Sequence, residues 1–331
     1  AVGLGIWEPE AMPGLVARVG EDYPREWLDA LKQRGFDTRG IRILPEAVDL
    51  RSFYAFTDRS TRLVDDPVVH FARLGLQFPK ALLGYRPPAN TFDSRTRLGP
   101  ISLRQGDFPE DFLDASAAHL CPLDYLTHTL LPAVLRQAGF TTVTLDPSPG
   151  TMTPTFWDDI PALLTGLTAF IPSEDDLRNL FHGRSTNLWQ MAEALGAYGC
   201  EFVVIKCGER GQLLYDSVSK ARWEISAYPA RLVDTTGAGD AFCGGFLAGY
   251  RRTYDPLQAV LHGIPRHVAD ARGAELLERV GLTGAADRRD DEAGIEMLVD
   301  AVGGQQEHIA HLDRQSLVVN FDLRVEAHGA T

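Results

Sequence analysis

The chain has 331 residues, enough for one large α/β domain or about two smaller ones. Hydrophobic residues make up 44% and charged residues 23%, which is typical of a globular protein and argues against wholesale disorder. Forty-five acidic residues against 32 basic ones give a formal charge of −13. Because a phosphate backbone is bound by a basic surface, nucleic acid and anionic membrane surfaces are not expected as partners.

The cysteines occur singly, as Cys121, Cys200, Cys207 and Cys243. Without a C-x-x-C pair or a histidine cluster nearby, they lack the pattern of a zinc site. We therefore expect reduced, mostly buried thiols in a cytoplasmic protein. No apolar run is long enough to span a bilayer, and the first eight residues lack the basic start of a signal peptide.

Strand-like apolar runs alternate with helical patterns along the chain. We expect a strand over 15–19 and a helix from about Pro24 to Gly35. The segment 40–62 has β-branched and aromatic residues in rough alternation, which predicts exposed antiparallel strands. Residues 65–112 are rich in proline and glycine, and we expect loops and short elements there.

The alternation is clearer beyond residue 115. Strands are expected over 117–121, 142–145, 168–171 and 202–205, and helices over 125–137, 157–164, 175–181 and 189–198. Continuous apolar strands separated by helices predict a parallel sheet that is covered on both faces. Segments 213–215 and 223–225 predict a small antiparallel addition to it.

The segment 232–250 carries the clearest chemical signal. It reads LVDTTGAGDAFCGGFLAGY, a strand end that leads through two glycines into a helix of small residues. Gly237 and Gly239 permit a tight turn and bring backbone N–H groups close to a ligand. Since the helix starts near Ala238, its unpaired amides and positive dipole end predict an anion site suited to phosphate. Glycines further along the helix, at 244, 245 and 249, indicate close packing or room for a ligand.

Asp240 places a carboxylate within this anion site. It would repel phosphate unless it had a chemical task, and phosphoryl transfer to an alcohol provides one. The carboxylate would orient the attacking hydroxyl and accept its proton, while the amides stabilise charge on the transferred group. Alternatively, Asp240 merely stabilises the start of a helix. The loop is neither a Walker A motif nor a dinucleotide-binding G-x-G-x-x-G.

Residues 234–242 (DTTGAGDAF), with Gly245-Phe246 after them, closely resemble the C-terminal signature of the pfkB (ribokinase-like) family of carbohydrate kinases. The resemblance implies a doubly wound, mainly parallel α/β/α sandwich with a small β-lid. It also implies ATP-dependent phosphorylation of a hydroxyl on a sugar or sugar-like small molecule. ATP and Mg²⁺ are the implied cofactors, with a monovalent cation as a further candidate. The implied catalytic base is Asp240, and the implied anion hole consists of Gly237, Ala238 and Gly239.

A second passage, 206–211 (KCGERG), resembles the family's T-x-G-x-x-G turn beside the nucleotide, with lysine in place of threonine. A plain hairpin would explain its two glycines equally well. Residues 19–22 (VGED) likewise resemble an early V-G-x-D passage of the family. The residues assigned to nucleotide binding are Lys206, Gly208, Gly211, Asp234, Thr235 and Thr236.

The family's N-x-x-E motif, which helps to organise Mg²⁺ and phosphate, should fall at residues 172–176 (PSEDD). Ser173 stands in place of the asparagine and Asp176 in place of the glutamate, with Glu174 and Asp175 as extra carboxylates. Because Mg²⁺ needs only one or two protein carboxylates, we assign Asp176 and Glu174 to the metal. The alternative is a helix capped by Ser173 with acids in its first turn, and both can hold together.

The resemblance runs from about residue 16 to about residue 263, and we expect one ribokinase-like α/β domain over 1–331. Within it, 40–62 are expected to form lid strands and 65–112 an insertion, while the tail 282–331 has no interpretation. The family's early aspartate and its Gly-Gly-x-x-x-Asn segment are not found, so the chain is expected to start just after them. The identity of the acceptor therefore stays open.

Two alternatives to a sugar kinase remain. One is a nucleoside kinase of the same fold. The other is a catalytically silent relative that acts as a binding or scaffold protein, which the substitutions at Ser173 and Lys206 and the unfamiliar tail would suit. The intact glycine loop and Asp240 favour an enzyme. A small-molecule substrate is the expected partner, and a homodimer formed through the lid is compatible with the resemblance.

Overall fold

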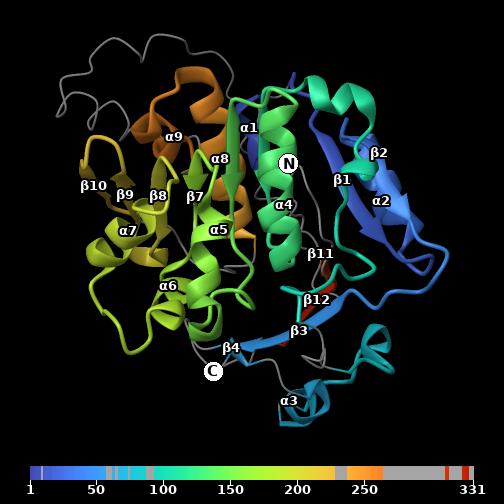
Figure 1. The fold of residues 1–331 in the computed structure, drawn as a ribbon. Helices are drawn as coiled ribbons and strands as arrows, with labels where there is room; N and C mark the ends of the chain where they lie inside the picture. The colour runs from blue at the N-terminus through green and yellow to red at the C-terminus, as the bar shows by residue number, and fades with distance from the viewer. Residues whose placement is uncertain are drawn as a thin grey trace.

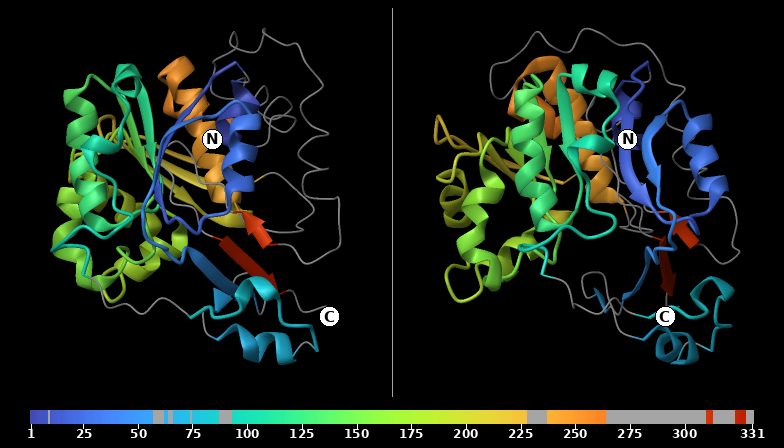
Figure 2. Two further views of the ribbon diagram at one scale, coloured as in Figure 1. Left: turned by 90° about the vertical axis from the view of Figure 1, so that its right-hand side faces the viewer. Right: turned by 45° about the vertical axis from the view of Figure 1, so that its right-hand side comes forward.

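A six-stranded sheet forms the centre of the protein (Figure 1). The strand order is β10-β9-β8-β7-β6-β5, and helices lie on both faces, so that three layers are visible from the side (Figure 2). This arrangement confirms the doubly wound α/β sandwich. The computed structural model describes residues 1–8, 10–56, 62–63, 66–73, 75–86, 93–227, 237–263, 310–312 and 323–327.

Four strands, β5, β6, β7 and β8, pair in parallel with one another in this order, and β5 forms one edge of the sheet. Leu145 of β6 lies opposite Leu120 of β5 and Phe170 of β7, so the carboxyl ends of these strands meet at one edge of the sheet. Two antiparallel strands, β9 and β10, extend the sheet beyond β8 as expected. The bounds are β5 (Ala117–Leu120), β6 (Thr142–Leu145), β7 (Ala169–Phe170), β8 (Phe202–Lys206), β9 (Gln212–Asp216) and β10 (Arg222–Ile225).

The helices divide between the two faces of this sheet (Figure 2). One face is covered by α4 (Tyr125–Gln137), α5 (Ile160–Leu164), α6 (Glu174–Leu180) and α7 (Leu188–Gly196). The other is covered by α8 (Ala238–Thr253) and α9 (Pro256–His262), and α1 (Val2–Trp7) packs on α8.

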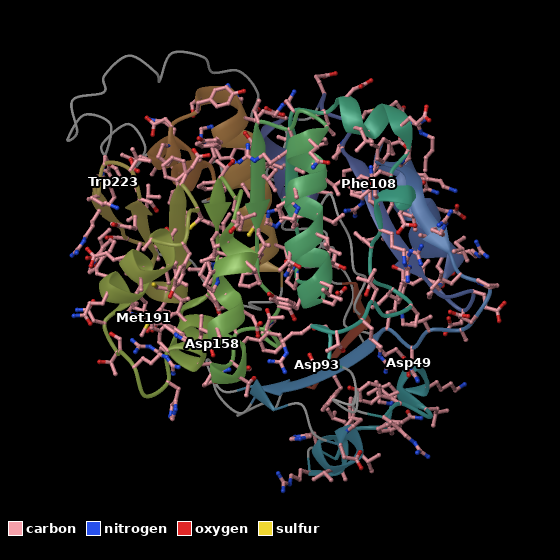
Figure 3. The ribbon with its side chains drawn as sticks, in the orientation of Figure 1. Asp49, Asp93, Phe108, Asp158, Met191 and Trp223 are labelled. Carbon is pink, nitrogen blue, oxygen red and sulfur yellow. The ribbon has the colours of Figure 1, made fainter. Side chains whose placement is uncertain are left out.

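Leu135, Leu163 and Met191 are fully buried in the core of the first face. Figure 3 labels Met191 on α7 and Trp223 on the outer strand β10. The helix expected over 157–164 starts as a 3-10 turn, η4 (Pro154–Asp159), and becomes α-helical at Ile160. Pro161 explains this boundary, because proline suits the first turn of an α-helix and not its interior.

A separate pair of strands, β1 (Gly14–Val19) and β2 (Asp37–Ile43), forms a parallel two-stranded sheet. The helix α2 (Arg25–Gln33) connects them. Antiparallel pairing expected from residue 40 onward is therefore wrong for β2, because a helical crossover returns the chain in the same direction. It is confirmed further along, where β3 (Arg51–Phe56) pairs with β4 (Arg62–Leu63).

Residues from the tail extend this second antiparallel unit. The strand β12 (Leu323–Ala327) pairs in parallel with β3, and β11 (Ala310–Leu312) pairs with β12. The result is a four-stranded sheet that lies below the six-stranded sheet in the view of Figure 1. Part of the uninterpreted tail thus joins the strands expected to form a lid.

Short elements alternate with loops in the described part of residues 65–112, as expected: α3 (Pro67–Arg73), η1 (Lys80–Leu82), η2 (Gln105–Asp107) and η3 (Glu110–Asp114). Asp107 fixes this segment to the β1–β2 sheet. Its fully buried carboxylate accepts from Arg18 Nε at 2.7 Å and from Arg42 Nη1 at 3.0 Å. Among the described residues, no helix is both long and apolar enough to cross a lipid bilayer.

Three glycines of α8 allow its backbone to approach other helices closely. A Cβ atom on Gly244 would lie 2.7 Å from the Leu4 nitrogen of α1. On Gly245 it would lie 2.2 Å from the His262 carbonyl oxygen of α9, and on Gly249 2.7 Å from the His262 ring. Close packing, rather than room for a ligand, therefore explains these glycines.

Replacing Gly245 by alanine should destabilise the protein by about 1–3 kcal/mol, because the new methyl group would overlap backbone atoms that cannot move independently. Urea unfolding measures the change. Gly106→Ala is the matched control, since nothing lies within 4 Å of its added Cβ atom. Equal stability of the two variants would contradict the packing assigned to α8.

Candidate active site

Polar and reactive side chains follow the parallel strands at their shared carboxyl edge. Cys121 comes directly after β5 and Asp146 directly after β6, while Lys206 is the last residue of β8. Between them, Ser173 follows β7 and forms an isolated parallel bridge with Lys206. The Lys206 amide donates to the Pro172 carbonyl at 2.9 Å, which fixes the end of β8 against this connection.

The amino end of α8 lies at this same edge. Gly237 precedes the helix with a φ of 75°, a left-handed conformation that glycine adopts without strain. Ala238 is exposed, and Gly239 and Asp240 are half-buried. The first amides of a helix have no partner within it, and in the described part of the chain no backbone acceptor faces those of Gly237, Ala238 and Gly239. An arrangement of this kind, with the first amides of a helix at the carboxyl edge of a sheet, is one that can bind an anion.

Lys206 lies directly against this helix start. A Cβ atom on Gly239 would be 3.3 Å from Lys206 Nζ, so a side chain at position 239 would fill the space between the two. The structure thus brings together the glycine loop at 237–239 and the lysine at the end of β8, which the sequence assigned separately.

A buried ion pair joins β6 and β8. Lys206 Nζ donates to Asp146 Oδ2 at 2.5 Å, and the Cys243 thiol of α8 lies 3.6 Å from that oxygen. Burial acts to lower the pKa of Lys206, but the charge of Asp146, with contributions from Cys243 and Asp176, outweighs it and raises the pKa above the usual value. Burial raises the pKa of Asp146, against the opposing effect of Lys206. We infer that Lys206 remains protonated at neutral pH.

Ser173 and Asp176 form a reciprocal cap at the start of α6. Ser173 Oγ accepts from the Asp176 amide at 3.1 Å and donates to Asp176 Oδ2 at 2.5 Å, and the Ser173 amide donates to the same oxygen at 3.0 Å. The capped helix is therefore confirmed. Burial raises the pKa of Asp176, although the hydrogen bond from Ser173 lowers it.

Glu174 is engaged by two arginines. Arg178 Nε donates to its carboxylate at 2.6 Å, and Arg210, from the turn after β8, forms a second ion pair with it. In the described residues no three His, Cys, Asp or Glu side chains are grouped to hold a metal ion. A divalent cation that keeps most of its waters and arrives with a ligand fits this donor set better than one held by the protein alone.

Gly208 and Gly211 form the turn between β8 and β9. Both have positive φ values, 56° and 91°. A Cβ atom on Gly211 would lie 2.0 Å from the Ile225 carbonyl of β10, so the hairpin itself requires glycine there. Around Gly208 nothing lies within 4 Å of an added Cβ atom. Three further residues assigned to nucleotide binding, Asp234, Thr235 and Thr236, lie outside the described residues.

Asp146 was missed by the sequence analysis, which predicted the strand over 142–145 and assigned no role to the residue that follows it. A usable signal was present: an acidic residue directly after a buried parallel strand lies at the edge where ligands bind in α/β sheets. The partner, Lys206, is 60 residues away in the sequence. Their contact depends on the order of the strands, which the sequence pattern did not specify.

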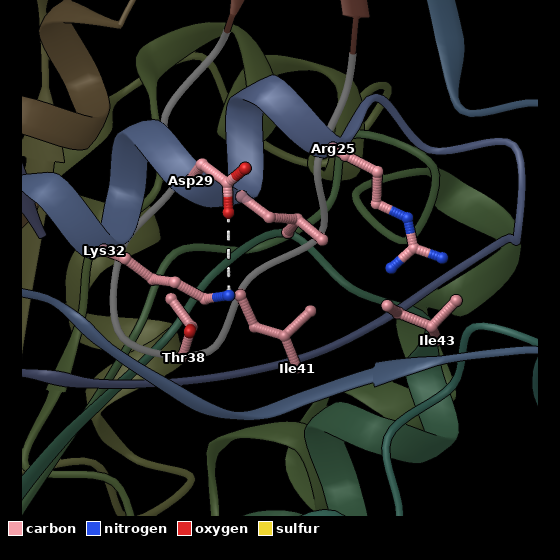
Figure 4. A pocket seen from close by; sticks show the side chains of 7 residues that line it. Arg25, Asp29, Lys32, Thr38, Ile41 and Ile43 are labelled. Carbon is pink, nitrogen blue, oxygen red and sulfur yellow. Dashed lines mark ion pairs between the residues drawn. The ribbon is translucent and has the colours of Figure 1, made fainter.

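A surface groove of about 370 Å³ lies elsewhere, between α2 and β2 (Figure 4). Lys32 and Asp29, both on α2, form an exposed ion pair of 3.7 Å on the helix side of the groove. It contains none of the residues at the carboxyl edge described above. The lining residues are Arg25, Leu28, Asp29, Lys32, Thr38, Ile41 and Ile43.

Comparison with known proteins finds similarity to kinases, both in a family model and in a curated relative. Residues 104–263 match the family model described as pfkB family carbohydrate kinase. A cytidine kinase from Thermococcus kodakarensis is 29% identical over 264 residues, which cover 77% of this chain and 80% of the relative.

Solved structures show the same fold. A nucleoside kinase from Burkholderia thailandensis in complex with inosine has a TM-score of 0.55 at 17% identity, over 84% of each chain. A fructokinase from Vibrio cholerae with bound fructose, ADP and calcium ion has a TM-score of 0.53 at 20% identity, over 79% of this chain and 80% of that one. The fold is therefore ribokinase-like.

Ser173→Ala should lower the free energy of unfolding by about 1 kcal/mol, because the α6 amides lose their capping oxygen. Asn187→Ala is the matched control. Asn187 caps α7 by accepting from the Trp189 and Gln190 amides, away from the carboxyl edge, and its loss should cost a similar amount. Urea unfolding of both variants checks this, and an unchanged midpoint for Ser173→Ala would show that the cap contributes nothing.

Proposed function

Residues 104–263 belong to the pfkB family of carbohydrate kinases, and from this we propose that the protein transfers the γ-phosphoryl group of ATP to a hydroxyl of a sugar or sugar-like small molecule. One observation carries the proposal. Asp240, half-buried, is the third residue of α8, directly after the glycine loop at 237–239, whose amides we assign to an anion. An acid next to an anion site suits a reaction in which a hydroxyl must lose its proton to attack a phosphoryl group.

In the proposed reaction the acceptor oxygen bonds to the γ-phosphorus while the bond from that phosphorus to the β–γ bridging oxygen breaks. ADP leaves, and the hydroxyl proton passes to a carboxylate oxygen of Asp240. The amides of 237–239 stabilise the charge that develops on the transferred group. Loss of one such donor costs about 3–4 kcal/mol in comparable anion holes.

Mg²⁺ bound to ATP would neutralise part of the phosphate charge. We assign Asp176 to this ion, through water, because its buried carboxylate lies at the carboxyl edge and interacts with Asp146 and Lys206 there. Glu174 would join it only on leaving Arg178 or Arg210. We assign no described residue to a monovalent cation.

We place the nucleotide along the end of β8 and its turn, at Lys206, Gly208 and Gly211, and include residues 234–236 from outside the described part. We also propose a cytoplasmic location. In the described part of the chain all four cysteines are buried and none forms a disulfide, whereas proteins of oxidising compartments commonly use disulfides.

A nucleoside is the second candidate acceptor. The similarity to the cytidine kinase extends over 77% of this chain, and this length favours that alternative. An ATP-consumption assay with separate pools of sugars and nucleosides decides between the two. Turnover with either pool also excludes a catalytically silent scaffold, whereas no turnover with any pool would overturn the proposed function.

Asp240→Asn should reduce kcat by about 10³-fold or more, because the amide keeps the shape of the side chain but cannot accept the proton. Nucleotide affinity should stay close to that of the wild type. Calorimetry for binding and a coupled ADP assay for turnover measure the two quantities.

Asp255→Asn provides the control, since the same change is made at the start of α9, where Asp255 only caps the helix. Asparagine caps about as well, so this variant should retain full activity. Wild-type turnover in Asp240→Asn would refute the role of Asp240 as the base.

A further inference from the structure

The Lys206 side chain contacts a residue from a strand that is not a neighbour of its own strand. Lys206 belongs to β8 and Asp146 follows β6, while β7 lies between them. Their side chains are only 16% and 9% exposed. The ammonium group therefore lies over the end of β7, in the middle of the carboxyl edge.

Acidic groups surround this ammonium. The charges of Asp146, from the end of β6, and Asp176, from α6, act on Lys206, and that of Asp240 acts on Asp146. The Cys243 thiol of α8 also lies nearby, but burial raises its pKa well above the usual value, so it carries no charge at neutral pH. From β5, His119 also faces Lys206, but burial lowers its pKa to about 3, so it carries no charge at neutral pH. Three carboxylates at one edge would repel a polyphosphate, and Lys206 supplies the opposing charge.

The position of the ammonium connects it to the anion site. Nζ would be 3.3 Å from a Cβ atom on Gly239, within the run of available amides. An ammonium has three N–H donors. Asp146 accepts one at 2.5 Å and the Cys243 sulfur lies 4.0 Å away. Among the described residues these are its partners, so one donor remains for a ligand in the space that Gly239 leaves open.

We propose that Lys206 binds the phosphoryl group as it is transferred, and that Asp146 is the positioning residue that holds the ammonium against the start of α8. The inference rests on the proposed function and adds two roles to it: Lys206 is a catalytic residue rather than only a nucleotide contact, and Asp146 acts through it. A pair that only joined β6 to β8 would need neither a remaining donor nor the open space at Gly239. Apolar residues of similar size often serve such a purpose as well as a buried ion pair.

The first test replaces the charge itself. Lys206→Met should lower kcat by about 10²–10³-fold, the effect of losing one donor to developing charge. It should also abolish the preference for the β,γ-imido analogue of ATP over ADP in calorimetric titration, since only the analogue carries the third phosphoryl group. Lys206→Arg, which keeps the charge, should restore part of that preference.

Asp146→Asn tests the positioning role. The asparagine still offers an oxygen to Lys206 but no charge, so burial then lowers the pKa of Lys206. The alkaline limb of the kcat profile should therefore move to lower pH, which the loss of a structural contact alone would not cause. Asp107→Asn is the matched control, because it breaks an equally buried pair with Arg18 and should cost stability without moving the profile.

A third variant avoids leaving a buried charge unpaired. Gly239→Ala improves helix propensity but places a methyl group 3.3 Å from Nζ. If Lys206→Met does not fold, this variant decides the question, and it should lose the preference for the analogue without losing stability.

The two levels of inference fail separately. No turnover of the wild type with any acceptor pool would overturn the proposed function, while the binding titrations would still test Lys206. Full kcat and an unchanged preference for the analogue in Lys206→Met, or in Gly239→Ala where Lys206→Met does not fold, would overturn the role of Lys206. If the alkaline limb of the kcat profile stays at the same pH in Asp146→Asn, the positioning role of Asp146 would be overturned.

Discussion

Close contact between the backbones of α8 and α9 determines where the amino end of α8 lies. Gly245 and Gly249 let the helix approach His262 to distances that a side chain would forbid, and Phe246 between them is fully buried in the same interface. A helix held this tightly presents its first amides at a fixed place relative to the sheet. The proposed anion site therefore depends on packing about two to three turns further along the helix.

Charge at the carboxyl edge follows from the same arrangement. The loop and helix dipole attract phosphate, whereas Asp146, Asp176 and Asp240 repel it. Lys206 changes this balance because it lies among these carboxylates, close to the amides. A site for phosphoryl transfer needs both signs of charge, a base to take the proton and donors to stabilise the phosphoryl group. Here the two kinds of group come from α8 and from the ends of the strands.

Much of the fold was predictable because it depends on local patterns. Buried apolar runs identified β5 to β8, and helical periodicity identified the helices between them. The β1–β2 pairing was not foreseen, because strand direction depends on the connection rather than on the alternation of side chains. Neither was the pairing of β12 with β3, which joins residues far apart in the sequence. Within the site, the loop at 237–240 was recognisable because its glycines and acid are contiguous.

The sequence by itself determined the order of strands and helices from 117 to 205, the position of the glycine loop with Asp240 before a helix, and the cap at Ser173. All of these use residues within a few positions of one another. Only the tertiary structure decided that the α8 glycines serve packing, that Glu174 pairs with Arg210, and that Asp146 meets Lys206. The physical reason is that such contacts depend on which strands become neighbours and how closely helices approach, and both follow from packing the whole chain.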